Sequence, residues 1–101
     1  MSNAPFTLRF TREAADVLQD LRGHGHHAKK LKKVQKALGL LQRDPRYPGL
    51  NSHKYSSLHG SQGEDVWDSY VENRTPSAWR IFWHYGPGED VLTILVIGPH
   101  P

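Results

Sequence analysis

The sequence predicts an α+β fold with the element order β-α-α-β-β-β-β, in which an antiparallel-rich sheet packs on a two-helix hairpin. Three observations predict this fold. The 101 residues suffice for one domain, spanning residues 1–101. The first half contains two stretches whose apolar residues recur at helical spacing. The second half divides into short β-type segments separated by turn sequences, and such short connections favour antiparallel pairing.

The first half is predicted to form one strand and then the helix hairpin. Residues 6–10 alternate apolar and polar side chains, as in a half-buried strand. Thr11 is suited to cap the first helix, and the glycines within residues 23–27 end it. The lysine-rich second helix carries its apolar residues on one stripe. It ends at Asp44, because Pro45 disfavours helical geometry in the residue before it.

The second half is predicted to supply the other four strands. The intervening segments are rich in Gly, Pro, Asn, Asp and Ser, the residues that turns favour. The expected strands are residues 53–58, 66–72, 78–85 and 91–97.

Composition limits the class of protein. The absence of cysteine excludes a disulfide framework and a cysteine-based zinc site. The longest apolar run, residues 91–97, is far short of the roughly 20 residues that a membrane span needs. The first ten residues lack the features of a signal peptide. A soluble, cytoplasmic protein is therefore expected.

The charge is unevenly distributed along the chain. Residues 1–55 carry eleven Lys and Arg against four Asp and Glu, whereas residues 56–101 carry two against six. A basic first half suggests a polyanionic partner, either nucleic acid or an acidic protein. On charge alone, lysines that simply solvate the second helix remain an equal alternative.

One arginine interrupts the most apolar predicted strand. Strand alternation places Arg80 with Phe82 and His84 on one face, and Trp79 with Ile81 on the helix-covered face. A buried, unpaired guanidinium is costly and cannot be relieved by losing its proton. We therefore expect Arg80 to pair with a carboxylate or to receive an anion on an open face. Spacing alone favours the ion pair, although a planar guanidinium on a rigid strand is also well suited to bind a phosphate group.

Other polar and aromatic residues have both functional and structural interpretations. The histidines at 24, 26 and 27 could bind a metal, but glycines separate them and no carboxylate is expected nearby, so a solvated turn without metal is predicted. Trp67 and Tyr70 could stack on a base, but large residues in a small sheet more often belong to the core. Asp68 and Glu72 could form a carboxylate pair for acid–base work, but either could simply neutralise Arg80 or Lys54, and neither is assigned to the site.

Taken together, these segments resemble the RelE/ParE family of bacterial toxin–antitoxin toxins. "HKYSSLHG" is similar to the family's entrance to its second strand, "AWRIFWHY" to its arginine-aromatic strand, and "LTILVIGPHP" to its last strand, which in some members ends on a histidine. The resemblance runs from about residue 6 to residue 101. It implies a RelE-like fold.

The resemblance also implies a function. Many members are ribosome-dependent mRNA endoribonucleases, in which the RNA 2′-hydroxyl attacks the adjacent phosphate without a metal or other cofactor. By position, Arg80 would hold the scissile phosphate and His100 would act as general acid or base. Lys54 and His53 would add positive charge or transfer protons. The expected RNA- and ribosome-binding residues are Lys29, Lys30, Lys32, Lys33 and Lys36.

The resemblance further implies a cognate antitoxin whose acidic or amphipathic segment wraps the toxin, besides the ribosome and mRNA as partners. A homodimer or a toxin–antitoxin hetero-oligomer is compatible with it. Two other functions stay open: a gyrase inhibitor of the ParE branch, and a non-catalytic RNA- or protein-binding module on the same fold. Convergence of Lys54, Arg80 and His100 on one site would distinguish the nuclease.

Overall fold

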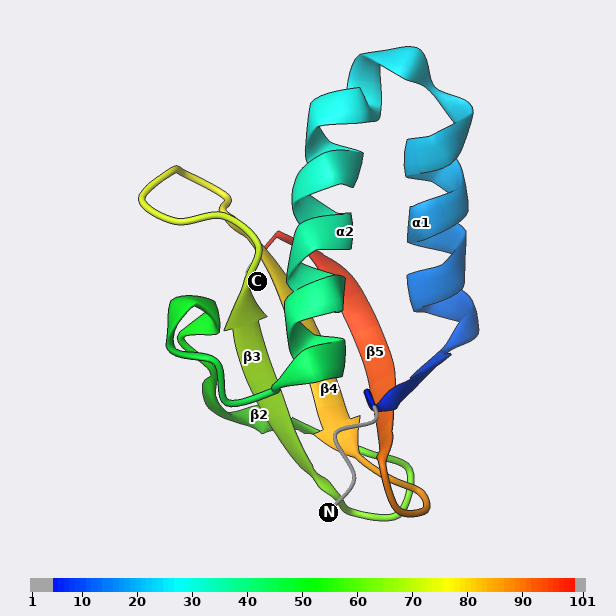
Figure 1. Cartoon of the computed structure of the whole chain (residues 1–101), viewed down its shortest axis with the longest axis vertical. Helices are drawn as coiled ribbons and strands as arrows, with labels where there is room; N and C mark the ends of the chain where they lie inside the picture. The colour runs from blue at the N-terminus through cyan, green and yellow to red at the C-terminus, as the bar shows by residue number, and fades with distance from the viewer. Residues whose placement is uncertain (1–4, 100–101) are drawn as a thin grey trace.

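The computed structural model describes residues 5–99, and its elements follow the predicted order. Two helices lie over one face of a five-stranded sheet (Figure 1). The strands are β1 (Thr7–Phe10), β2 (His53–His59), β3 (Asp65–Tyr70), β4 (Trp79–Tyr85) and β5 (Val91–Pro99). The helices are α1 (Arg12–Gly23) and α2 (Ala28–Arg43), with the short 3₁₀ helices η1 (Gly25–His27) and η2 (Pro48–Leu50).

The sheet is mostly antiparallel, as the short connections predicted. Its order is β1-β5-β4-β3-β2, and β2, β3, β4 and β5 pair antiparallel in sequence order. The first strand pairs with the last, β5, in parallel, with Thr7 opposite Val91. In the sequence, α1 and α2 separate β1 from β2. In the sheet, β1 and β2 form the two opposite edges.

The core lies between the helices and the sheet. It is formed by apolar side chains of α1, α2, β4 and β5, including the fully buried Val34, Leu41, Ile81 and Ile94. Thr11 fixes the start of α1 in the predicted way, because its Oγ1 accepts a hydrogen bond from Ala14 N–H at 3.2 Å. The same hydroxyl donates to the Leu95 carbonyl at 2.7 Å, which ties the helix to β5.

The face of β4 turned away from the helices is less open than the alternation pattern suggested. The register places Arg80, Phe82 and His84 there, as predicted, but Phe82 is only 2% and His84 only 3% exposed. One cause is Tyr55 of β2, whose ring packs on Phe82 with centroids 5.0 Å apart. Arg80, near the start of β4, therefore lies on a partly covered face.

Within residues 5–99, no helix is both long and apolar enough to cross a membrane.

Candidate active site

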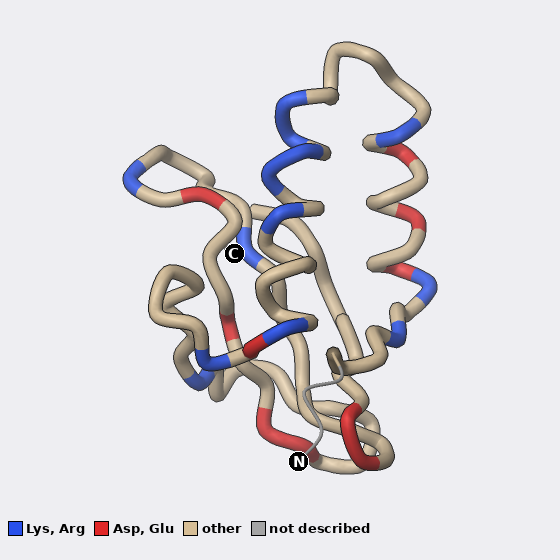
Figure 2. The backbone as a smooth tube through the Cα atoms, viewed as in Figure 1, with Lys and Arg blue, Asp and Glu red and all other residues tan. Residues whose placement is uncertain are grey.

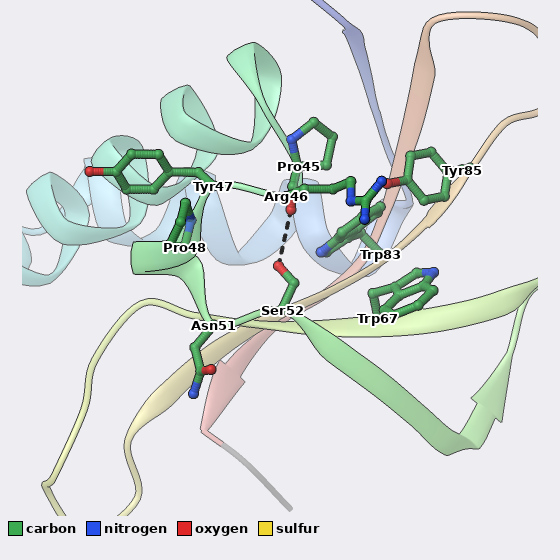
Figure 3. A pocket seen from close by; sticks show the side chains of 9 residues that line it. All are labelled: Pro45, Arg46, Tyr47, Pro48, Asn51, Ser52, Trp67, Trp83 and Tyr85. Atoms are coloured by element: carbon green, nitrogen blue, oxygen red, sulfur yellow. Dashed lines mark hydrogen bonds between the residues drawn. The ribbon is translucent and has the colours of Figure 1, made fainter.

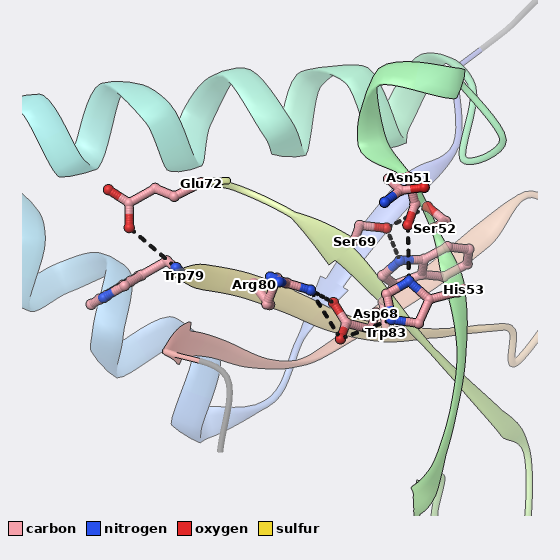
Figure 4. Close-up of polar contacts among 9 residues, drawn as sticks. All are labelled: Asn51, Ser52, His53, Asp68, Ser69, Glu72, Trp79, Arg80 and Trp83. Carbon is pink, nitrogen blue, oxygen red and sulfur yellow. Dashed lines mark hydrogen bonds and ion pairs between the residues drawn. The ribbon is translucent and has the colours of Figure 1, made fainter. Parts of the chain in front are cut away.

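The candidate site centres on Arg80, near the end of the sheet where β5 finishes. Arg80 lies opposite Tyr70 of β3 and Gly98 of β5. Its guanidinium stacks on the Tyr70 ring, with the central carbon 3.8 Å from the ring centroid. Asp68, two residues before Tyr70 on the same face, offers it a carboxylate (Figure 4). The ion pair expected from spacing is therefore present.

The contact between Arg80 and Asp68 is loose. The Nη1 atom lies 3.4 Å from Oδ1 and 3.5 Å from Oδ2, whereas a tight guanidinium–carboxylate pair has distances of about 2.7–2.9 Å. In addition, Arg80 Nε is buried and has no hydrogen-bond acceptor among residues 5–99. Buried donors are nearly always paired, so this guanidinium retains unused hydrogen-bonding capacity.

His53, the first residue of β2, joins the same cluster through Asp68. Its Nε2 lies 3.4 Å from Asp68 Oδ2, and its Nδ1 lies 3.0 Å from the Asn51 carbonyl oxygen. Asp68 is fully buried and lies between the side chains of Arg80 and His53 (Figure 4). Both ring nitrogens of His53 thus lie near oxygen atoms, which restricts the orientation of the imidazole.

A buried hydrogen-bond network holds β2 in this position. Ser52 and Ser69 hydroxyls are 2.6 Å apart, and Trp83 Nε1 donates to Ser69 Oγ at 2.8 Å. Ser52 also donates to the Pro45 carbonyl at 3.2 Å. Because Ser52 directly precedes His53, this network fixes the start of β2 and the histidine next to it.

The other two predicted catalytic residues are not brought to Arg80 by the described structure. Lys54 is opposite Trp67 in the register and therefore belongs to the other face of the sheet from His53. Its ammonium lies 3.2 Å from Asp65. His100 lies outside the described residues. Of the predicted set, the structure joins Arg80 with His53 and separates both from Lys54.

The predicted RNA-binding lysines divide into two groups along α2, where Figure 2 shows several basic segments in succession. Lys30 and Lys33 contact Glu72 at 2.7 Å and 3.3 Å, and Lys30 also lies over the Trp79 ring. The remaining lysines of the set, Lys29, Lys32 and Lys36, are exposed. These three form an unneutralised basic stripe among the described contacts.

Glu72 is the group that anchors α2 to the strands. Its Oε1 also accepts a hydrogen bond from the Trp79 N–H at 3.1 Å. Burial alone would raise the pKa of Glu72, but the hydrogen bonds from Lys30, from Trp79 N–H and from Lys33 outweigh burial. The pKa therefore lies below its ordinary value of 4.5. Of the two carboxylates weighed from the sequence, Asp68 pairs with Arg80, whereas Glu72 pairs with Lys30 and Lys33 and not with Arg80 or Lys54.

A cleft of about 650 Å³ opens on the helix side of the sheet, beyond the end of α2 (Figure 3). Arg46, Tyr85 and the stacked Trp67 and Trp83 line it, with the indole centroids 6.3 Å apart. Trp67 is half-buried against the core, as the structural interpretation predicted. It lies on the opposite face from Arg80, so a base stacked here would be separated from the arginine by the sheet.

The sequence prediction missed a carboxylate beside the histidines of the hairpin turn. Asp20 lies one helical turn before His24, and its Oδ1 is 3.5 Å from His24 Nδ1. The spacing of four residues on a helix was the available signal.

Comparison with known proteins defines the class to which this architecture belongs. The sequence matches no protein-family model and no curated protein. The structure, in contrast, is similar to solved toxins of toxin–antitoxin systems. These include the YoeB/ParE toxin of Agrobacterium tumefaciens, at 14% identity and a TM-score of 0.69, covering 94% of this chain and 99% of that one.

Two further solved structures are toxin–antitoxin complexes. The archaeal RelE–RelB complex of Pyrococcus horikoshii matches at 16% identity and a TM-score of 0.62, covering 94% of both chains. The Escherichia coli RelBE complex matches at 17% identity and a TM-score of 0.59, covering 95% of this chain and 98% of that one. The chain therefore has a type II toxin fold, and within that class the RelE/YoeB/ParE fold, as the sequence resemblance predicted.

Proposed function

We propose that this protein is the toxin of a type II toxin–antitoxin pair and that it cleaves mRNA on the ribosome. The observation that carries the proposal is the loosely paired guanidinium of Arg80 on a rigid strand, 3.4–3.5 Å from Asp68, with His53 beside the same carboxylate. The planar guanidinium has N–H donors that can bind the oxygens of a phosphate. The imidazole of the adjacent His53 is a group that can act as a general acid. The RelE/YoeB/ParE fold supports the same function.

The proposed reaction is an internal transfer at the phosphate. The RNA 2′-oxygen attacks the adjacent phosphorus and its proton passes to a general base; the bond from phosphorus to the 5′-oxygen breaks, and a general acid protonates that oxygen. The products are a 2′,3′-cyclic phosphate and a 5′-hydroxyl. Arg80 stabilises the charge that develops on the phosphorane oxygens. We assign proton donation to His53, and the remaining acid or base role to His100.

Asp68 acts in this proposal as a positioning residue. Its carboxylate oxygens lie 3.4–3.5 Å from Arg80 Nη1 and 3.4 Å from His53 Nε2, and the Asn51 carbonyl oxygen lies 3.0 Å from His53 Nδ1. The carboxylate is fully buried, so it fixes both side chains without reaching the RNA itself.

The lysines of α2 contribute binding in this proposal, not chemistry. Exposed ammonium groups gain affinity for phosphates by releasing counterions, whatever the base sequence. On α2 this role belongs to Lys29, Lys32 and Lys36. Lys30 and Lys33, which are paired with Glu72, add to the positive electrostatic potential around them. Lys54 lies on the other face of the sheet and is assigned no contact with the scissile phosphate.

A cognate antitoxin is the proposed protein partner, in a toxin–antitoxin hetero-oligomer in the cytoplasm. The similar toxins of Pyrococcus horikoshii and Escherichia coli were solved as complexes of that kind. An acidic antitoxin segment would meet the same basic stripe on α2 as ribosomal RNA, and the two would then compete for it.

Primer extension on a reporter mRNA in a translation extract, with and without ribosomes, tests the function. We expect cleavage only with ribosomes, and a loss on the order of 100-fold or more in Arg80→Lys, which keeps the charge but loses the fork. Lys54→Gln serves as the matched control and is expected to cleave nearly as well as the wild type.

The competing function is inhibition of DNA gyrase, which the separation of Lys54 from Arg80 favours. Intact mRNA with inhibition of gyrase supercoiling by the wild type would replace the nuclease proposal with that one. Cleavage unchanged in Arg80→Lys would contradict the assigned site.

A further inference from the structure

We propose that the tip of the helix hairpin binds a divalent transition-metal ion, represented by Zn²⁺, through Asp20, His24 and His27. Their ligand atoms all lie within 4.8 Å of one another. Asp20 belongs to α1, His24 follows directly after α1, and His27 ends η1 just before α2. The tip projects from the helices at the end remote from the β4–β5 turn (Figure 1).

The geometry requires only small side-chain movements. Ligands of a tetrahedral zinc ion, bound at about 2.0–2.2 Å, lie roughly 3.3–3.5 Å from one another. The ligand atoms of Asp20, His24 and His27 already lie within 4.8 Å of one another. Asp20 and His24 are exposed and His27 is half-buried, so all three side chains can rotate by the ångström that remains.

The histidine environment also suits a metal ligand. His24 Nδ1 lies 2.9 Å from the Asp20 carbonyl oxygen and can donate its N–H there. A ligating histidine commonly donates one ring nitrogen to a backbone carbonyl, which leaves the other nitrogen with a lone pair for the metal. His26 further packs its ring against His27, with centroids 4.0 Å apart, and so restricts the orientation of His27.

The donor set selects the kind of metal. Two imidazoles and one carboxylate favour Zn²⁺, Ni²⁺ or Cu²⁺, whereas Mg²⁺ and Ca²⁺ need several oxygen ligands that this tip does not offer among its three ligating groups. An ion held here would tie the end of α1 to the start of α2. Because it binds the folded chain, it would raise the melting temperature.

Calorimetric titration of the full chain, free of any polyhistidine tag, with Zn²⁺ tests the site, followed by the optical spectrum with Co²⁺. We expect one Zn²⁺ per chain, visible absorption from tetrahedral Co²⁺, and a higher melting temperature with Zn²⁺. The double variant His24→Ala/His27→Ala and the single variant Asp20→Asn should each weaken binding on the order of tenfold or more.

The matched controls are His59→Ala, an exposed histidine of β2, and Asp16→Asn, one turn before Asp20 on α1. Both are expected to bind Zn²⁺ as the wild type does. Circular dichroism checks that every variant is folded. The proposal is overturned if the wild type binds no Zn²⁺, or if the cluster variants bind it as tightly as the controls.

Discussion

Asp68 is the residue on which the candidate site depends. Its side chain is fully buried, and it contacts both the guanidinium of Arg80 and the imidazole of His53. A buried carboxylate requires compensating cations, and a buried cation requires the carboxylate in return. The carboxylate of Asp68 therefore fixes the position of both side chains that the proposal assigns to the chemistry.

Substitution of Asp68 by Asn tests this dependence through stability. We expect the free energy of unfolding to fall by about 3 kcal/mol, because Arg80 would remain largely buried without its carboxylate. Urea unfolding followed by circular dichroism measures the change. Asp65→Asn, which removes the exposed partner of Lys54, should cost no more than about 0.5 kcal/mol. Equal effects of the two variants would show that Arg80 does not rely on Asp68.

At the scale of elements, α2 serves both the core and the surface. One side contributes the fully buried Val34 and Leu41, and the other carries the lysines. Glu72 joins these two roles, because it binds Lys30 and Lys33 of α2 and the backbone N–H of Trp79 at the start of β4. This carboxylate therefore holds the basic helix against the sheet.

The depressed pKa of Glu72 predicts acid sensitivity of this link. Its pKa is lower in the folded chain than in the unfolded chain, so its stabilisation is full above the ordinary value of 4.5 and is lost as the pH falls through the folded value. We expect wild type to be more stable than Glu72→Gln at pH 7, with the difference shrinking below about pH 4.5. Urea unfolding across pH measures it, with Glu89→Gln in the β4–β5 turn as control. A difference independent of pH would contradict the ion pairs.

The exposed stripe of α2 predicts a salt-dependent interaction. Replacing Lys29, Lys32 and Lys36 by Gln should weaken ribosome binding and reduce the slope of log affinity against log salt by up to about 2–3, since each lost phosphate contact contributes roughly 0.7–0.9. Binding to purified ribosomes at several salt concentrations measures the slope. Removing the same number of charges elsewhere, from Arg9, Arg12 and Arg22, provides the control. Equal slopes in both triple variants would assign binding to overall charge instead of this stripe.

For the molecule as a whole, the sequence predicted the element order but not every contact. Apolar periodicity and turn residues located the helices and strands, and Thr11 capped α1 as expected. The parallel pairing of β1 with β5 could not be read from local pattern, because it joins opposite ends of the chain. The Arg80–Asp68 pair was foreseeable from charge and spacing.

The candidate site was predicted less completely, for a physical reason. Strand alternation assigns faces within one strand but does not relate the faces of two strands until their register is known. Lys54 and His53 were therefore both assigned to the site of Arg80, and only the pairing of β2 with β3 separated them. The position of Asp20 beside His24, in contrast, was present in the sequence as a spacing of four residues.

The most direct test of the nuclease account is single-turnover cleavage of a ribosome-bound mRNA that carries one 2′-deoxynucleotide immediately before the mapped cut. The account predicts that this mRNA binds normally but is not cleaved there, because the attacking 2′-hydroxyl is missing. The all-ribose mRNA should yield a 2′,3′-cyclic phosphate, and Arg80→Lys should reduce its rate on the order of 100-fold. Cleavage of the deoxy-substituted mRNA at the wild-type rate would contradict 2′-hydroxyl attack and with it the assigned chemistry.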